Sequence, residues 1–362
     1  MKVAVLGAAG TIGPAIVRDL ASSEEVESIL LLDLRAEQAK AVADQHGLGK
    51  ATVRGADARS SLAGELAAVD VLVNSASYRV NLDAMRACLE ADCHYLDLGG
   101  LYRMTGEQLL LGPDFERAGL LAVLGIGSSP GKTNLMAARA ARDLGDVDAV
   151  HVCAASRDLE RPPGLSFPYA LETLIDEFRL RPVVLRNGEP VRLQPLSPGG
   201  EVNFGEPIGR AETIYTLHSE IRTFGQSFGC ASASFRLSLG RELLERLREL
   251  AAGSEEEMRS AARQAQLPSP RTVSVHLVEA SGHGRTVRMR AVTEPNEEWG
   301  LGGGVVSTAA SIAAAVRLLA RDSINACGVL PPERCIVPEQ MFAELEGRGC
   351  RFELDLTETA AV

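Results

Sequence analysis

The first third of the chain alternates short apolar runs with amphipathic stretches. The apolar runs predict strands at 2–6, 28–33, 51–55, 69–74, 94–99 and 120–125, with helices from residue 14, over 36–46 and over 81–91. Strands that alternate with helices in this way indicate a parallel sheet covered on both faces. We therefore predict an α/β fold with a doubly wound parallel Rossmann sheet of six strands, complete near residue 126, and a first domain over 1–126.

Longer strands and hairpins replace this alternation after about residue 148. Asn187-Gly188 separates the apolar runs 182–185 and 189–194, which indicates a hairpin, and 281–284 joins a second pair at 272–280 and 285–293. Helices are expected over 241–252 and 255–265. These elements predict a second, α+β domain over 127–305, built on a mixed or antiparallel sheet that binds substrate and forms a dimer. A C-terminal helix and tail, 306–362, would pack back towards the first domain.

The turn after the first predicted strand contains three glycines. Gly7, Gly10 and Gly13 stand in G-x-x-G-x-x-G spacing between a strand and a helix. Gly7 would permit the tight turn, Gly10 the close approach of a pyrophosphate, and Gly13 the contact of the helix with its strand. The other residues expected to contact the dinucleotide in this loop are Ala9, Thr11 and Ile12. A tight first loop without a cofactor is the alternative interpretation.

The strand ends that follow supply further cofactor candidates. Asp33, with Leu34 beside it, ends the second strand where an acid takes the adenosine ribose hydroxyls and favours NAD, while Arg35 could accept the 2′-phosphate of NADP. We therefore expect NAD, with NADP possible. Side chains at later strand ends could also contact the dinucleotide, although turn chemistry explains them equally well: Asp57, Asn74, Ala76 and Ser77.

Composition fits a two-domain enzyme of the cytoplasm. The 362 residues are 46% hydrophobic and 23% charged, and the net charge of -11 argues against nucleic acid. No signal peptide is evident, and the apolar stretch 305–320 carries Arg317 and is short for a bilayer, so no membrane partner is expected. Seven scattered cysteines without C-x-x-C spacing suit reduced thiols, and no metal-ligand pattern appears.

A second glycine loop follows the sixth predicted strand. Gly127 and Gly131 lie before Lys132-Thr133, which imitates a P-loop but leaves three residues between the glycines instead of four. Pro130 also removes one backbone donor. A P-loop nucleotide hydrolase is therefore a minor alternative.

Several motifs together resemble the saccharopine dehydrogenase-like enzymes, and in organisation the lysine 6-dehydrogenases. They are the N-terminal glycine turn, Tyr95-Leu-Asp-Leu-Gly-Gly100, the Pro130-Gly131 loop with Asn134, 167–186 ending in Leu-Arg-Asn-Gly, and Gly328-Val-Leu-Pro-Pro-Glu333. The chain departs from this pattern in its lengthened glycine turn and in Lys132 and Thr133. The resemblance implies hydride transfer between NAD(P) and the carbon of a C–N bond in an amino acid or amino-acid conjugate, through an imine. Gly131 and Asn134 would then help to bind that substrate.

The segment 210–222 contains the residue types that this chemistry needs. On a strand, alternation would place His218, Glu220 and Arg222 on one face. His218 is the candidate base or proton shuttle, Glu220 its orienter or the partner of the ammonium, and Arg222 or Arg210 the clamp for a substrate carboxylate. A solvated polar sheet edge is the alternative.

Two further candidates flank the expected cleft between the glycine turn, the 129–134 loop and the His218 segment. Lys132 is the one lysine placed to act as a base or anion contact, unless it is a first-turn residue that faces water. Tyr78 follows the fourth strand near the expected nicotinamide, where packing is equally plausible. The apolar helix near 307–321 suggests a homodimer. A dinucleotide sensor that has lost its chemistry remains the main functional alternative.

Overall fold

The computed structural model describes residues 1–60, 62–160, 170–264 and 269–358. The chain forms two compact units, one from 1–132 with 308–344 and the other from 133–307 with 345–362. The chain passes from one unit to the other after residues 132 and 307, close to the domain boundaries expected at 126 and 305. The expected single C-terminal segment 306–362 is instead divided between the two units.

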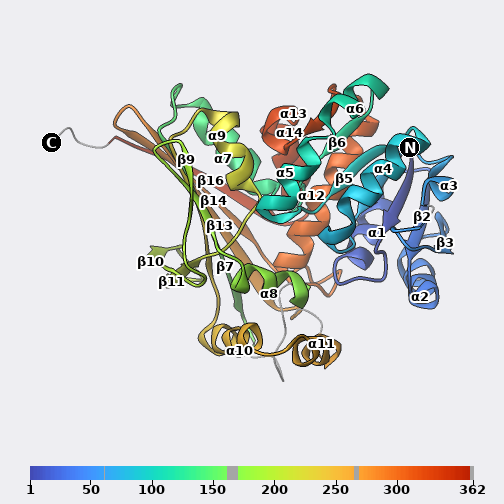
Figure 1. The fold of residues 1–362 in the computed structure, drawn as a ribbon, viewed down its shortest axis with the longest axis horizontal. Helices are drawn as coiled ribbons and strands as arrows, with labels where there is room; N and C mark the ends of the chain where they lie inside the picture. Colours follow the sequence, from blue (N-terminus) through green and yellow to red (C-terminus); the bar gives the residue numbers. More distant parts are fainter. Residues whose placement is uncertain (61, 161–169, 265–268, 359–362) are drawn as a thin grey trace. The chain divides into compact units, whose positions relative to one another are not determined.

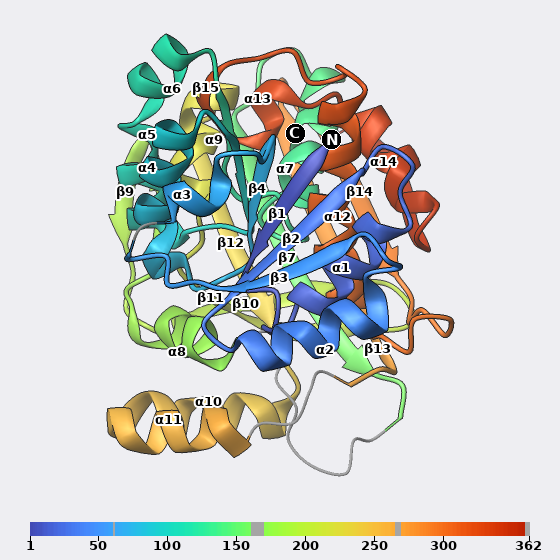
Figure 2. The ribbon, with the colours of Figure 1, turned by 90° about the vertical axis from the view of Figure 1, so that its right-hand side faces the viewer.

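The first unit is built on a parallel sheet with the order β15-β6-β5-β4-β1-β2-β3. Its strands are β1 (Lys2–Leu6), β2 (Ser28–Asp33), β3 (Ala51–Gly55), β4 (Val71–Asn74), β5 (His94–Asp97), β6 (Leu121–Val123) and β15 (Gly328–Leu330). Figure 2 looks onto β1, β2 and β3, which lie side by side. The prediction that this sheet is complete near residue 126 is wrong, because β15 adds a seventh strand parallel to β6. A strand of three residues leaves no pattern that reveals a partner two hundred residues away.

Helices accompany this sheet in the order of a doubly wound fold (Figure 1). They are α1 (Gly13–Ala21), α2 (Ala36–His46), α3 (Ala63–Leu66), η1 (Tyr78–Val80), α4 (Asn81–Ala91), α5 (Leu101–Leu109), α6 (Gly112–Ala118), α12 (Gly303–Ala320), α13 (Pro332–Cys335) and α14 (Pro338–Glu346). The 18 residues of α12 have a mean hydropathy of 1.5, long and apolar enough to cross a membrane, but 83% of them are buried inside the protein. Burial to that extent is typical of a core helix.

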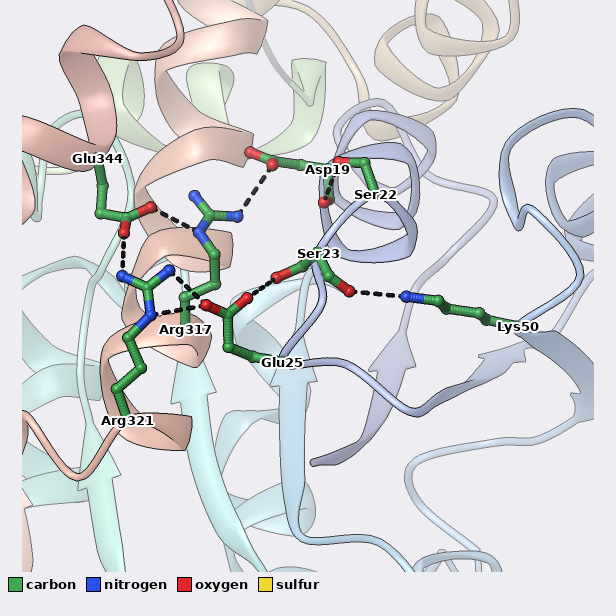
Figure 3. Close-up of polar contacts among 8 residues, drawn as sticks. All are labelled: Asp19, Ser22, Ser23, Glu25, Lys50, Arg317, Arg321 and Glu344. Carbon is green, nitrogen blue, oxygen red and sulfur yellow. Dashed lines mark hydrogen bonds and ion pairs between the residues drawn. The ribbon is translucent and has the colours of Figure 1, made fainter.

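An ion-pair network ties α12 to α1 and α14 within the first unit (Figure 3). Arg317 of α12 contacts Asp19 Oδ1 at 3.0 Å through Nη1 and Glu344 Oε2 at 2.6 Å through Nε. One turn later, Arg321 binds the other oxygen of Glu344 at 2.6 Å and Glu25 Oε1 at 2.6 Å. Asp19 is fully buried and Arg317 nearly so, which places this ion pair in the interior of the first unit.

The second unit is built on a mixed nine-stranded sheet, as expected. Its main order is β10-β11-β12-β7-β13-β14-β16, with β8 and β9 branching from β12, and β7 and β12 pair in parallel while their other neighbours are antiparallel. The strands are β7 (Ala149–Asp158), β8 (Val183–Arg186), β9 (Glu189–Arg192), β10 (Pro198–Asn203), β11 (Arg210–Tyr215), β12 (Ser232–Ser238), β13 (Thr272–Gly282), β14 (Arg285–Thr293) and β16 (Cys350–Glu358).

Both predicted hairpins are confirmed, and their turns explain why the sequence revealed them. Asn187 and Gly188 have φ of 53° and 79°, and His283 and Gly284 have φ of 51° and 72°. Two consecutive positive φ values are the geometry of the type I′ turn, one of the two common forms of a two-residue hairpin loop. The helices that belong to this unit are α7 (Lys132–Arg142, from Thr133), α8 (Leu171–Arg179), α9 (Glu220–Phe228), α10 (Arg241–Ala252) and α11 (Glu255–Gln264).

Candidate functional site

The glycine turn between β1 and α1 has the shape that a dinucleotide needs. Gly7 has φ of +79°, and a Cβ there would lie 2.6 Å from Ala76 N, while a Cβ at Gly13 would lie 2.4 Å from Ala8 O. Gly10 donates to Gly7 O at 2.9 Å, and a Cβ there would meet only Gly7 O at 3.0 Å and Ser75 O at 3.9 Å. Helix α1 begins at Gly13 without a side-chain cap from Ile12. Pro14 has no N–H and Ala15 N donates to Ile12 O at 3.1 Å, so the N–H group of this helix start that can meet a phosphate is that of Gly13. The residues present fit a dinucleotide.

Asp33 and Arg35 hold this turn from the end of β2. Asp33 is buried, and its carboxylate accepts hydrogen bonds from Ala9 N and Arg35 N, each at 2.9 Å. Arg35 in turn donates to Ala9 O at 2.7 Å and keeps 54% of its side chain exposed. Leu34 between them is 73% exposed. In this state both charged side chains brace the loop, and their expected contacts with the ribose or a 2′-phosphate stay predictions.

The other predicted cofactor residues differ in how much of their side chain a ligand could use. Asp57 accepts from Arg59 N at 3.0 Å, which is turn chemistry, and Ser77 caps η1. Asn74 is buried, with its oxygen held by Ala76 N at 3.0 Å and its amide nitrogen within 3.0 Å of Tyr95 and Asn81. Residues 75–77, and not the side chain of Asn74, are therefore the part of this strand end that a coenzyme could contact. Tyr78 is half-buried, with the Arg79 guanidinium 5.0 Å from its ring centre.

The loop 127–131 closes on itself. Gly127 N donates to Pro130 O and Lys132 N donates to Gly127 O, each at 2.9 Å. A Cβ at Gly131, where φ is +119°, would lie 2.3 Å from Gly127 O. Backbone donors that a P-loop would turn towards a phosphate are used inside this loop, which removes the support for a nucleotide hydrolase. The alternative that Lys132 faces water is wrong, because its side chain is fully buried, and Asn134 is buried as well.

The segment that carries His218 turns out to be a strand, a short turn and a helix. The expectation of one strand face for His218, Glu220 and Arg222 is wrong, since β11 ends at Tyr215 and α9 begins at Glu220. Apolar Ile221 and Phe224 are buried at helical spacing, and Gly229 ends the helix with φ of 69°. That spacing was the missed signal.

The helix nevertheless brings two of the predicted residues together. His218 Nδ1 forms a hydrogen bond with Glu220 Oε2, and Thr133 Oγ1 donates to Glu220 Oε1. The predicted arginines are elsewhere, because Arg222 is exposed on α9 and Arg210 is exposed and bound to Glu201 at 2.7 Å. The structure therefore gives no support to either arginine as a carboxylate clamp.

Electrostatics and packing fix the state of the His218 ring. It stacks on Phe235 with centroids 3.6 Å apart and 15° between the planes. Burial lowers the pKa of His218, but the charge and hydrogen bond of Glu220 and the charge of Glu177 outweigh it, so the pKa is raised above its ordinary value. The hydroxyls of Thr216 and Ser219 on either side are buried without a hydrogen-bond partner in the described part of the chain. This cluster lies wholly in the second unit.

Sequence reasoning missed a polar cluster in the first unit. Asn74, Asn81, Tyr95, Asp97 and Gln108 are all buried beneath the carboxyl ends of β4 and β5. The signals were the positions of Asn74 and Asp97 at the ends of apolar strands, the second of them inside the motif 95–100. No sequence spacing connects residues 74, 81, 97 and 108, because their contacts arise from the fold.

Comparisons with known proteins agree with the geometry. Residues 3–123 match the model of the saccharopine dehydrogenase NADP binding domain. The whole chain resembles apo histidine-tagged saccharopine dehydrogenase (L-Glu forming) from Saccharomyces cerevisiae, at 12% identity and a TM-score of 0.72 over 98% of this chain and 99% of that one. It also matches an oxidoreductase from Agrobacterium radiobacter in complex with NAD+, L-tartaric acid and magnesium, at 14% identity and a TM-score of 0.46 over 96% and 94% of the chains.

The family match covers the β1–α1 turn and the strands through β6, which is the part of the chain whose glycines form the cradle. The wider likeness extends the same fold to the second unit. Residues 3–123 therefore form an NAD(P)-binding domain that matches the saccharopine dehydrogenase family model, and the chain as a whole shares the fold of saccharopine dehydrogenase.

Proposed function

We propose that this protein oxidises or forms a C–N bond of an amino acid or amino-acid conjugate, with NAD(P) as the hydride carrier and an imine as the substrate-derived intermediate. The observation that carries the proposal is the buried His218–Glu220 pair. NAD(P), held by the glycine turn, would supply acceptance or donation of the hydride. The family match of the first domain supports the coenzyme, and the relative of known structure is itself a saccharopine dehydrogenase.

His218 has the properties of a proton-transfer residue. An amine must be neutral before it can be oxidised, and water must then attack the imine, so a base is needed at both stages. Because Nδ1 is bound to Glu220, Nε2 is the ring atom that can exchange a proton with a ligand. Thr133 holds the other oxygen of Glu220, and Phe235 fixes the ring plane. Glu220 therefore acts as the orienter of His218.

Fewer residues are candidates for substrate contacts than the sequence indicated. Lys132 remains a candidate anion contact or base, since it is buried at the first turn of α7. Gly131 and Asn134 remain candidates for the substrate loop, and Tyr78 for the nicotinamide end of the coenzyme. Arg210 and Arg222 are left out because both are exposed and Arg210 is already paired.

Turnover with a panel of amines tests the proposal. Wild type is incubated with NAD+ or NADP+ and with lysine, saccharopine-like conjugates, other amino acids and polyols, and formation of reduced coenzyme is measured. We expect reduction with an amino-acid amine, and a loss of about 10²-fold or more in kcat for His218→Asn at unchanged coenzyme affinity. His283→Asn, at an exposed histidine paired with Asp146, is the matched control.

Three outcomes would contradict the proposal. Turnover of polyols alone would replace the C–N substrate class, and full activity in His218→Asn would remove the assigned base. Coenzyme binding without turnover of any substrate would favour the dinucleotide-sensor alternative.

A further inference from the structure

A buried carboxylate lies under the carboxyl ends of β4, β5 and β6. Asp97, the last residue of β5, is 1% exposed. Its Oδ2 accepts hydrogen bonds from Gln108 Nε2 at 2.6 Å, Tyr95 Oη at 3.0 Å and Asn81 Nδ2 at 3.1 Å. Its Oδ1 accepts from Gly125 N at 2.7 Å and Gly99 N at 2.9 Å. Five neutral donors thus surround one carboxylate, and no cationic side chain pairs with it among the residues that the structure describes.

These bonds determine the path of three loops. Gly99 and Gly125, held by Asp97 Oδ1, begin the connections after β5 and β6, and both have positive φ. Asn81 joins the carboxylate to Asn74 at 2.9 Å, and Asn74 holds Ala76 N at 3.0 Å in the loop after β4. Asp97 also accepts from Ile126 N through its backbone oxygen at 2.7 Å. One side chain and its partners therefore set the backbone at three neighbouring strand ends.

The place of these loops in the sheet indicates what they serve. With the order β15-β6-β5-β4-β1-β2-β3, the direction of winding reverses between β1 and β4. In such sheets one mononucleotide lies over the first three strands and the other over the strands beyond the switch point. The glycine turn and Asp33 lie on the first half, so the nicotinamide mononucleotide belongs over β4, β5 and β6. That is the edge that the Asp97 network organises.

We propose that Asp97 is a positioning residue for the nicotinamide half of the coenzyme, which it serves without touching it, by holding the loops after β4, β5 and β6 in the shape that receives that half. The inference rests on the NAD(P) binding of the first domain. It assigns the two halves of the coenzyme to different residues of that domain. The glycine turn and Asp33 hold the adenosine diphosphate, and the Asp97 network fixes the loops that receive the nicotinamide half.

The carboxylate can be changed with little change of volume. In Asp97→Asn, one oxygen can still accept from Gly99 and Gly125, but the new amide nitrogen then faces the donors of Asn81 and Gln108. In Asp97→Asn with Gln108→Glu, an acceptor is restored opposite that nitrogen. Asp92→Asn removes the same charge from an exposed position with φ of 61°, which asparagine tolerates, and is the matched control.

The experiment compares coenzymes with fragments that lack nicotinamide. Dissociation constants are measured by calorimetry for NADPH against 2′-phospho-ADP-ribose and for NADH against ADP-ribose, together with the thermal midpoint. We expect Asp97→Asn to weaken the preferred reduced coenzyme about tenfold or more, and to leave the matching fragment within about twofold. The double variant should recover most of the loss, and Asp92→Asn should bind as wild type does.

A milder variant keeps the inference testable if Asp97→Asn does not fold. Tyr95→Phe removes one of the five donors and should weaken the reduced coenzyme by a smaller factor, again without effect on the fragment. Equal weakening of coenzyme and fragment, or of neither, would overturn the positioning role. Failure of the wild type to bind any of the four ligands would instead overturn coenzyme binding itself, so the two failures are distinguishable.

Discussion

The protonation of His218 depends on one neighbouring carboxylate. The pKa of His218 is lowered by burial and raised by Glu220 and Glu177, with a net rise. Glu220→Gln removes the nearest charge and leaves the burial, so the pKa should fall. Because the base acts in its neutral form, the acid limb of the pH profile of kcat/KM for amine oxidation should move to lower pH. The maximal rate should also fall about tenfold, through poorer orientation of the ring.

The pH–rate profile of wild type and variant measures this shift. Glu189→Gln, at an exposed carboxylate of β9 in the same unit, is the control and should leave the profile in place. A limb that stayed fixed, or that moved to higher pH, would show that Glu220 does not govern the titration of His218.

At the scale of the residue, the sequence indicated where polar and glycine residues come together only where one short pattern carried the information. The glycine turn, Asp33 and the His218–Glu220 partnership were visible because each follows from spacing or residue type within a short stretch. Asn74 was predicted at a strand end as a possible dinucleotide contact, which stays a prediction, and its burial with Tyr95 and Asp97 depends on the packing of β4, α4, β5 and α5. The ion pair of Arg210 with Glu201 was not predicted, because Glu201 lies on a neighbouring strand whose pairing the sequence did not show.

Gly7 and Gly10 of the β1–α1 turn are glycines for different reasons, one for the fold of the turn and the other for the coenzyme. Gly7 is needed by the turn itself, because its φ is positive and a Cβ would collide with the backbone of residue 76. At Gly10 a Cβ would lie 3.0 Å from Gly7 O, so alanine there needs that backbone oxygen to shift by a few tenths of an ångström, less than the collision at Gly7 demands, and would interfere mainly with a bound pyrophosphate. We expect Gly10→Ala to cost less than about 1 kcal/mol in stability yet weaken NADPH binding about tenfold or more. Gly7→Ala should reduce both.

Urea unfolding and calorimetry with NADPH check this pair of variants. Gly64→Ala, where a Cβ meets nothing within 4 Å in α3 of the same unit, is the control for the substitution itself. If Gly10→Ala bound NADPH as tightly as wild type, the close approach assigned to Gly10 would be wrong.

Element types were predictable where the hydrophobic period was long or the turn residues distinctive. The helices α2, α4 and α10 have the bounds that the pattern indicated, and both hairpins formed about their asparagine or histidine and glycine turns. The failure at 216–222 has a physical reason. His218, Glu220 and Arg222 alternate like a strand, while Ile221 and Phe224 repeat like a helix, and burial of the apolar pair decided the outcome.

The organisation of the whole chain depends on contacts that no local pattern encodes. Residues 308–344 return to the first unit, where β15 extends the sheet, while 345–362 return to the second, where β16 extends the other. The tail was expected to return to the first domain, and its division between two sheets was not foreseen. The sequence pattern of β15 or β16 shows at most that each is a strand. It does not show which of the two sheets either strand joins, so sequence alone could not assign them.

The Asp19–Arg317–Glu344 network joins this returning segment to α1, in addition to the pairing of β15 with β6, and its removal should be costly. Asp19 and Arg317 are almost completely buried. Asp19→Asn therefore removes one of the two carboxylates that neutralise the Arg317 guanidinium in a setting of low dielectric constant. We expect a loss of about 3 kcal/mol in the free energy of unfolding, whereas Glu107→Gln, in the exposed Arg103–Glu107 pair, should change it by less than about 1 kcal/mol. Since the single tryptophan, Trp299, belongs to the second unit, the measurement should be hydrogen exchange of α1 and α12 under native conditions. Unchanged protection of both helices in Asp19→Asn would show that apolar packing alone holds α12 in place.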